Sequence, residues 1–241
     1  MTRGGRAALV LVLATGACVP RAAPAQDARF TYDQGGITRG ARDRKELALI
    51  FTGGDFAEGA TTILDALRER GVQASFFVTG GFIRHPEFDG ILRRIVAEGH
   101  YLGPHSDAHL LYAPWDDRSR TLVTRDSFRI DLEKNLDALA RYGRTREQMR
   151  FFIPPFEWYN RQIADWSRQM GLLLFNFTPG TRSHTDYMAD RDPRFVPSRQ
   201  IVASILEYDD FDAIAGYLVA TVDLCAPELG RNRIRGCWSG D

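Results

Sequence analysis

Short apolar segments alternate with amphipathic helical patterns along most of the chain, and this alternation constrains the fold more than any other feature. A run of about four to six apolar residues bounded by turn residues is typical of a buried strand, whereas apolar positions at helical spacing indicate a helix. Strands that are separated by helices form parallel sheets, and about six or seven such units favour a barrel over an open sheet. We therefore expect an α/β fold, a deformed (β/α) barrel of about seven strands. The expected strands are 46–51, 74–78, 100–103, 151–153, 172–177 and 216–222, and the expected helices are 61–70, 88–98, 126–142, 162–170 and 198–207.

The clearest helical pattern covers residues 126–142. Thr124 precedes it as a candidate N-cap, because a threonine hydroxyl can accept a hydrogen bond from a free amide of the first turn. One face carries the apolar residues Phe128, Leu132, Leu136 and Leu139. This spacing predicts a helix that buries that face against the sheet.

Three of the five histidines lie within residues 99–109, and two of them, His105 and His109, are four residues apart in a His-Ser-x-x-His arrangement. On one helical turn such residues face the same way, so both imidazoles could bind one metal ion. A histidine pair at this spacing is also common on surfaces and at caps. Here the pair follows the expected strand 100–103 and Pro104, where a strand gives way to a loop, and this position favours a functional role.

Four segments in this order resemble the polysaccharide deacetylases with a NodB-homology domain, carbohydrate esterase family four. They are residues 48–65, 74–80, 95–100 and the His105–His109 motif, and the resemblance extends over about residues 46–222. It implies a deformed barrel whose strand ends hold one divalent metal, commonly zinc, and an activity that removes N- or O-acetyl groups from an acetylated glycan. A metal with an open coordination position lowers the pKa of bound water to roughly 7 and polarises a carbonyl.

The resemblance implies His105 and His109 as two metal ligands, but the usual pair of aspartates at the end of the first strand is replaced by Thr52 and Gly53. Asp55 lies two positions further on. We assign it as the third metal ligand and as a candidate catalytic residue. The alternative is a carboxylate that stabilises the N-terminus of the helix that follows.

The third family motif corresponds to residues 152–158, where the usual Arg is absent and Phe156 replaces a Tyr. Glu157 is a candidate substitute acid or base, although a loop glutamate is commonly only solvated. The candidate substrate-binding residues are Pro155, Phe156, Trp158 and Arg182, with burial in the core as the alternative for Trp158 and solvation for Arg182.

The last expected strand lacks the histidine with which the family's final strand ends, since residues 219–225 contain none. The tail 223–241 also shows no clear helical pattern, and a truncated or out-of-frame C-terminus would explain both features. A second hypothesis is therefore a catalytically impaired carbohydrate-binding protein that keeps the deacetylase barrel. A third is that both histidines are structural.

The N-terminal 25 residues have the pattern of a secretory signal peptide. Arg3 and Arg6 precede an apolar run too short to span a bilayer, and small residues lead to an expected cleavage after Ala25. Lipidation at Cys18 is the alternative. Residues 26–45 are expected to be a linker or N-terminal arm, and the protein is expected to be exported, periplasmic or extracellular, without a transmembrane segment in the mature chain.

Charge and cysteine content limit the partners. Removal of residues 1–25 takes away three arginines and no acidic residue, which leaves 28 basic and 31 acidic residues. This balance and the lack of a basic cluster argue against nucleic-acid binding. Cys225 and Cys237 could pair in an oxidising compartment or remain free thiols, and the sequence does not set the oligomeric state.

Overall fold

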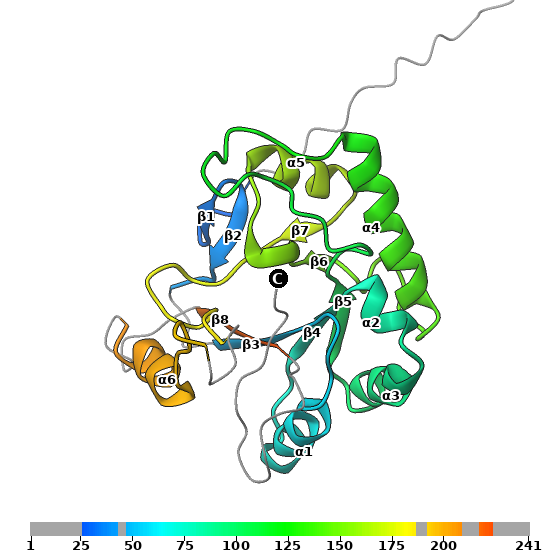
Figure 1. The fold of residues 1–241 in the computed structure, drawn as a ribbon, viewed down its shortest axis with the longest axis vertical. Helices are drawn as coiled ribbons and strands as arrows, with labels where there is room; N and C mark the ends of the chain where they lie inside the picture. Colours follow the sequence, from blue (N-terminus) through cyan, green and yellow to red (C-terminus); the bar gives the residue numbers. More distant parts are fainter. Residues whose placement is uncertain (1–25, 43–46, 187–191, 209–216, 224–241) are drawn as a thin grey trace, which may run out of the picture.

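The computed structural model describes residues 26–42, 47–186, 192–208 and 217–223 (Figure 1). Its main sheet contains four parallel strands in the order β5-β4-β3-β8. These are β3 (Leu47–Gly53), β4 (Ser75–Val78), β5 (Tyr101–Pro104) and β8 (Tyr217–Asp223). β6 (Phe151–Phe152) and β7 (Leu173–Leu174) form a second, short parallel pair. The expected parallel α/β arrangement is thus present, and the strands are divided between separate sheets.

Helices surround these strands on the outside (Figure 1). The five helices expected from the sequence begin and end within two residues of their expected bounds, and the short helix α2 was not expected. The helices are α1 (Ala60–Arg70), α2 (Gly80–Arg84), α3 (Asp89–Ala97), α4 (Arg125–Ala140), α5 (Arg161–Gln169) and α6 (Ser198–Leu206), with 3₁₀ turns at η1 (Pro86–Phe88) and η2 (Pro155–Glu157).

Helix α4 follows the predicted pattern. Thr124 is its N-cap, and the Thr124 hydroxyl accepts a hydrogen bond from the Ser127 N–H. The four predicted apolar residues are buried in the main core, together with Phe76, Phe82, Leu92, Phe152 and Tyr159. Burial of this one face fixes α4 beside β5 and α2, which matters for the loop that follows β5.

The boundary between β5 and β6 is bridged by a side chain. The Tyr101 hydroxyl accepts a hydrogen bond from the Phe151 N–H at 3.0 Å and donates one to the Phe151 carbonyl at 3.2 Å. Burial raises the pKa of Tyr101 to about 12, so its hydroxyl keeps the proton that it donates. This side chain thus links β5 to β6, which belong to separate sheets among the described residues.

Part of the segment 26–45, which is expected to be a linker or N-terminal arm, forms a hairpin. β1 (Thr31–Asp33) pairs antiparallel with β2 (Gly36–Arg39), whose residues are all buried. Ile37 forms a parallel bridge with Phe175, and the Ile37 carbonyl accepts the Asn176 N–H at 2.8 Å. These strands are not visible as a pattern in the sequence, because they contain few apolar residues and are stabilised by distant parts of the chain.

Gly80, the first residue of α2, leaves no room for a side chain. A Cβ at this position would lie 1.9 Å from Oδ1 of Asp107, whereas a Cβ at Gly90 in α3 would meet nothing within 4 Å. We expect Gly80→Ala to lower the free energy of unfolding by about 2 kcal/mol, because the buried Asp107 carboxylate must move. Gly90→Ala is the matched control and should raise it by about 0.5–1 kcal/mol. Urea denaturation of both variants tests this pair, and a Gly80→Ala protein as stable as the wild type would contradict it.

Candidate functional site

The residues expected at the site follow the C-terminal ends of parallel strands. Asp55 lies after β3, His105 follows β5 directly, and η2 comes after β6. The carboxyl ends of parallel strands share one edge of a sheet, which is where ligand sites form in such folds.

His105 is held in a defined orientation at this edge. Its side chain is buried, and Nδ1 lies 2.9 Å from the Ile153 carbonyl oxygen. A carbonyl only accepts, so Nδ1 donates and the lone pair is on Nε2. Burial lowers the pKa of His105 to about 3, and His109 contributes to this shift. A neutral imidazole whose Nδ1–H is bound to a carbonyl is the usual state of a histidine metal ligand.

His109 lies beside His105. Their ring centroids are 5.1 Å apart, and the rings are tilted by 59°. Two imidazoles that bind one tetrahedral cation at about 2.1 Å bring their ring centroids to roughly 5 Å from each other. The spacing of the pair therefore fits a shared divalent cation.

Helix α4 fixes the loop that carries this pair. The Asp131 carboxylate accepts hydrogen bonds from the Ser106 hydroxyl at 2.6 Å, the Asp107 N–H at 3.1 Å and the Ala108 N–H at 2.8 Å. One turn further along α4, Oδ1 of Asn135 accepts the His105 N–H at 3.0 Å. Two buried polar side chains of one helix thus determine the backbone path from residue 105 to residue 108.

Asp107 ties the same loop to α2. Its buried carboxylate contacts Nη1 of Arg84 at 2.5 Å and Nζ of Lys134 at 2.7 Å. Burial alone would raise the pKa of Asp107, but the hydrogen bonds from Arg84 and Lys134 outweigh it and hold the pKa below its usual value. Asp107 therefore stays charged and is a structural anchor for the histidine loop.

Asp55 is not brought into a common group with the two histidines. Its side chain is exposed, and its Oδ1 lies 3.9 Å from the position that a Cβ would take at Gly81, in the first turn of α2. Within the described residues, no group of three His, Cys, Asp or Glu side chains is arranged to hold a metal ion. The structure thus brings two imidazoles together, and their role as metal ligands stays a prediction, as does the third ligand.

The segment after β6 contacts the histidines from the other side. The Phe156 ring lies 4.4 Å from the His109 ring. Pro155 is buried, and Glu157 is half-buried, with its carbonyl accepting a hydrogen bond from Asn176. Trp158 is half-buried and stacks on Arg118 at 4.5 Å. Trp115 contacts both Phe156 and Trp158, so these two candidate substrate-binding residues lie with it in one aromatic cluster beside His109.

Backbone strain concentrates at the same place. Four non-glycine residues here have positive φ: Ser106 at 72°, His109 at 53°, Phe156 at 59° and Glu157 at 50°. In the described part of the chain only one other non-glycine residue, Gln34, shares this property. Such strain is typical of functional sites, where the surrounding structure holds residues in place.

Arg182 lies apart from this cluster. Its side chain is exposed, and its N–H donates to the Ser204 hydroxyl of α6 at 2.9 Å. The neighbouring His184 stacks on Phe177 with centroids 3.7 Å apart. These contacts give the loop after β7 a structural link to α6, and the substrate-binding role of Arg182 stays a prediction.

The half-buried ring of His184 should make the stability of the protein depend on pH. Burial lowers its pKa from 6.5 to about 4. Between these values the unfolded chain binds a proton that the folded protein does not, so stability falls as the pH drops from about 6.5 to about 4. We expect the free energy of unfolding of His184→Gln to fall by ~2 kcal/mol less than that of the wild type over this pH range. This difference is smaller than the full pKa shift implies, because the ring is partly exposed. Urea denaturation at pH 7, 5.5 and 4.5 measures the difference in slope, and parallel curves for the two proteins would contradict it.

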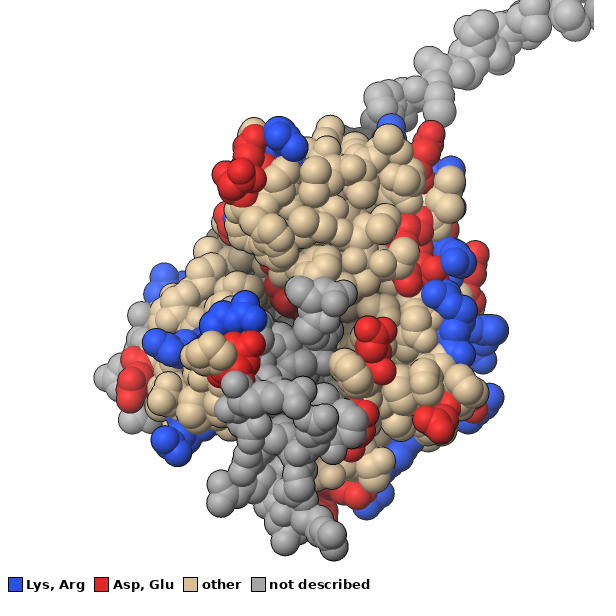
Figure 2. All heavy atoms as spheres, in the orientation of Figure 1, with Lys and Arg blue, Asp and Glu red and all other residues tan. Residues whose placement is uncertain are grey.

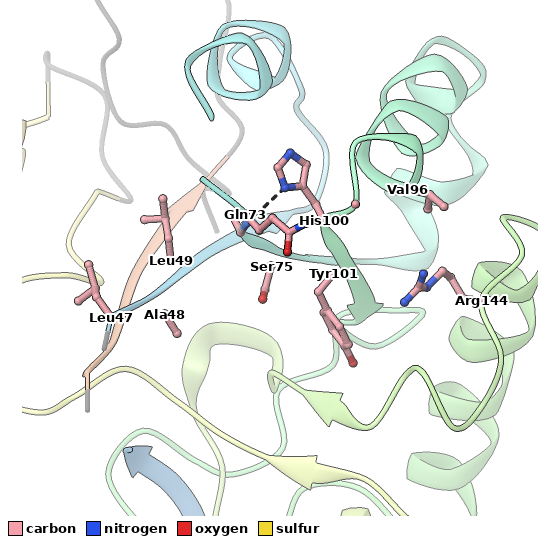
Figure 3. A pocket seen from close by; sticks show the side chains of 11 residues that line it. Leu47, Ala48, Leu49, Gln73, Ser75, Val96, His100, Tyr101 and Arg144 are labelled. Atoms are coloured by element: carbon pink, nitrogen blue, oxygen red, sulfur yellow. Dashed lines mark hydrogen bonds between the residues drawn. The ribbon is translucent and has the colours of Figure 1, made fainter. Parts of the chain in front are cut away.

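A hollow of about 350 Å³ lies at the opposite ends of β3, β4 and β5 (Figure 3). His100, the third histidine of the 99–109 segment, lines it, and its Nδ1 accepts the Ala74 N–H at 3.2 Å, drawn as a dashed line. Burial lowers the pKa of His100. His100 therefore has a structural role at the end of the sheet away from His105 and His109.

Charge is distributed without a dominant basic region on the face drawn in Figure 2. There, Lys and Arg side chains are interspersed with Asp and Glu around the margins. No helix in the described residues is long and apolar enough to cross a membrane. Residues 1–25, which are expected to be a signal peptide and include Cys18, lie outside the described residues, as do residues 224–241 of the tail with Cys225 and Cys237.

Sequence reasoning missed the side chains that support the histidine pair. Asp131 and Asn135 lie on the apolar face of α4, and polar residues on a predicted buried face were an available signal. The exposed Trp115 contacts both Phe156 and Trp158, and no pattern in the sequence linked it to them.

The chain is similar in sequence to known deacetylases. A peptidoglycan-N-acetylglucosamine deacetylase of Bacillus cereus is 26% identical over 187 residues, which cover 76% of this chain and 62% of that protein. The chain thus spans less than two thirds of that relative.

Two solved structures share the fold. A CE4 family pseudoenzyme from Bacillus anthracis superposes with a TM-score of 0.62 at 18% identity, over 80% of this chain and 59% of that one. A peptidoglycan N-acetylglucosamine deacetylase superposes with a TM-score of 0.58 at 22% identity, over 76% and 74%. These likenesses confirm the predicted deformed (β/α) barrel fold. The family model for polysaccharide deacetylases matches residues 39–175, more than half of the chain, and the chain therefore belongs to the polysaccharide deacetylase family.

Proposed function

We propose that this protein is a metal-dependent hydrolase that removes acetyl groups from N-acetylglucosamine units of peptidoglycan or a related glycan. The observation that carries the proposal is the histidine pair: two neighbouring imidazoles 5.1 Å apart, one of them fixed with its Nε2 lone pair available. The name of the Bacillus cereus relative supports the choice of glycan.

His105 and His109 would hold one divalent metal, with zinc as the first choice and Asp55 as the proposed third ligand. When bound, such a metal supplies polarisation of the acetyl carbonyl and acidification of a water molecule. Glu157, half-buried beside Phe156, is the proposed residue that accepts or donates a proton, and Asp55 is the alternative. Phe156 and Trp158 would contact the sugar, since aromatic rings bind the apolar faces of pyranoses.

Acetate release tests the proposal. Protein loaded with zinc should release acetate from N-acetylglucosamine oligomers or peptidoglycan fragments, chelation with EDTA should stop the reaction, and added zinc should restore it. Elemental analysis should find about one metal per chain. Zinc-loaded protein that releases no acetate from any of these substrates would contradict the proposal.

A second candidate is a catalytically impaired glycan-binding protein. Thr52 and Gly53 stand where the family has its aspartate pair, and Asp55 is exposed and apart from the histidines. Binding of the same oligomers without acetate release would support this candidate over the first.

Export is proposed from the pattern of residues 1–25, and it places the protein where a cell-wall glycan is accessible. Mass spectrometry of the mature protein should find Gln26 at the N-terminus. A lipid-modified Cys18 would support the alternative anchor.

A further inference from the structure

Trp115 is an exposed indole near the histidine pair, in the loop between β5 and α4. Its side chain is 59% exposed, the largest exposure among the large apolar residues of the described chain. A single exposed apolar residue is common on protein surfaces and needs no explanation. The residues around Trp115, however, indicate that its exposed ring has a function.

A continuous series of ring contacts connects Trp115 to His109. The ring centroids of Phe156 and His109 are 4.4 Å apart. Those of Trp115 and Phe156 are 5.8 Å apart, and these two rings are almost perpendicular. Trp115 is also 5.6 Å from Trp158. Two ring contacts thus separate Trp115 from the proposed metal ligand, and a sugar on Trp115 would be a neighbour of the sugar at the histidines.

The support of Trp115 is rigid. The Trp158 indole N–H donates to the carbonyl of Pro114, the residue before Trp115, at 3.1 Å. Arg118 stacks on the Trp158 ring, donates to the Tyr159 carbonyl at 2.8 Å and pairs with Asp33 at 2.8 Å. A platform held in this way loses little conformational entropy when a ligand binds.

We propose that Trp115 binds the sugar unit next to the one that carries the reacting acetyl group. A pyranose has an apolar face of C–H groups that packs on an indole, while its hydroxyls stay at the solvated rim. Such a contact needs no charge on the ligand. The inference rests on the proposed function for the position of the reacting sugar, and it specifies that the substrate is an oligomer or polymer and not a single sugar.

Chain-length dependence tests this role. We expect Trp115→Ala to lower kcat/KM for tetra-N-acetylchitotetraose about tenfold, mainly through KM, and to leave kcat/KM for N-acetylglucosamine unchanged. Trp115→Phe should recover part of the loss, because it keeps an aromatic face. Val202→Ala is the matched control, since Val202 is 52% exposed on α6, outside the aromatic cluster.

A binding measurement separates this inference from the proposed function. Protein labelled with 5-fluorotryptophan has four resonances, and the one lost in Trp115→Phe belongs to Trp115. Addition of tetra-N-acetylchitotetraose should shift that resonance, whether or not acetate is released. Suppose that acetate is released. The inference is then overturned if Trp115→Ala changes kcat/KM equally for the tetramer and for N-acetylglucosamine, or changes it for neither. If no acetate is released, the proposed function fails, and the Trp115 shift alone supports or overturns the inference.

Discussion

The protein with both His105 and His109 replaced by alanine is expected to bind no zinc and to release no acetate. The two imidazoles lie 5.1 Å apart between ring centroids, and removal of both leaves no imidazole nitrogen at the end of β5. Elemental analysis after dialysis measures the first effect, and acetate release measures the second. Stoichiometric zinc in the double variant would overturn the assignment of the site.

Two further variants make this result interpretable. His105 is buried, so the double variant also loses packing, whereas His109 is only partly buried. His109→Ala alone should keep the fold, as judged by circular dichroism, and should still lose stoichiometric zinc. His85→Gln is the matched control, because His85 stacks on Phe88 outside the site and its replacement should leave zinc content unchanged.

Asp131→Ala is expected to destabilise the protein by about 3 kcal/mol and to weaken zinc binding at least tenfold. The Asp131 carboxylate accepts hydrogen bonds from Ser106, Asp107 and Ala108, and its removal leaves two backbone amides and a hydroxyl without this acceptor. Because these three residues lie between His105 and His109, the effect should reach the metal site. Urea denaturation and competition with a chelator measure the two effects.

The control for this prediction lies on the same helix. The Asp137 side chain is 74% exposed and pairs with Arg146, so Asp137→Ala should change stability by no more than about 0.5 kcal/mol. An Asp131→Ala protein within 1 kcal/mol of the wild type, with unchanged zinc affinity, would show that the loop keeps its conformation without this carboxylate.

The sequence predicted the fold where local patterns were strong. The apolar face of α4 and the continuous apolar runs of β3 and β4 follow from burial against a sheet, and burial of this kind is visible as periodicity. The hairpin β1–β2 lies in the segment expected to be a linker or N-terminal arm, and its strands were not predicted because they are short and polar. Their stability comes from contacts with residues more than a hundred positions away, such as the bridge between Ile37 and Phe175.

The candidate site was predicted in part for the same reason. His105 and His109 are close in sequence, so their spacing alone indicated a shared role, and the structure keeps them together. Asp55 was connected to them by a family pattern from which this chain departs, and the structure leaves it exposed beside α2. Arg182 was chosen from its loop, and only the position of that loop against α6 shows that it lies apart from the aromatic cluster.

The sequence by itself determined the parallel α/β architecture, the family and the histidine pair, because each depends on residues that are neighbours along the chain or repeat at regular spacing. The tertiary structure alone decided what surrounds the pair. The Ile153 carbonyl accepts a hydrogen bond from His105, the Asp131 carboxylate binds the loop between the two histidines, and the Phe156 ring contacts both His109 and Trp115. These contacts join segments that are 20 to 50 residues apart and have no common period. Only the packing of α4 and of the β6 segment against the end of β5 brings them together.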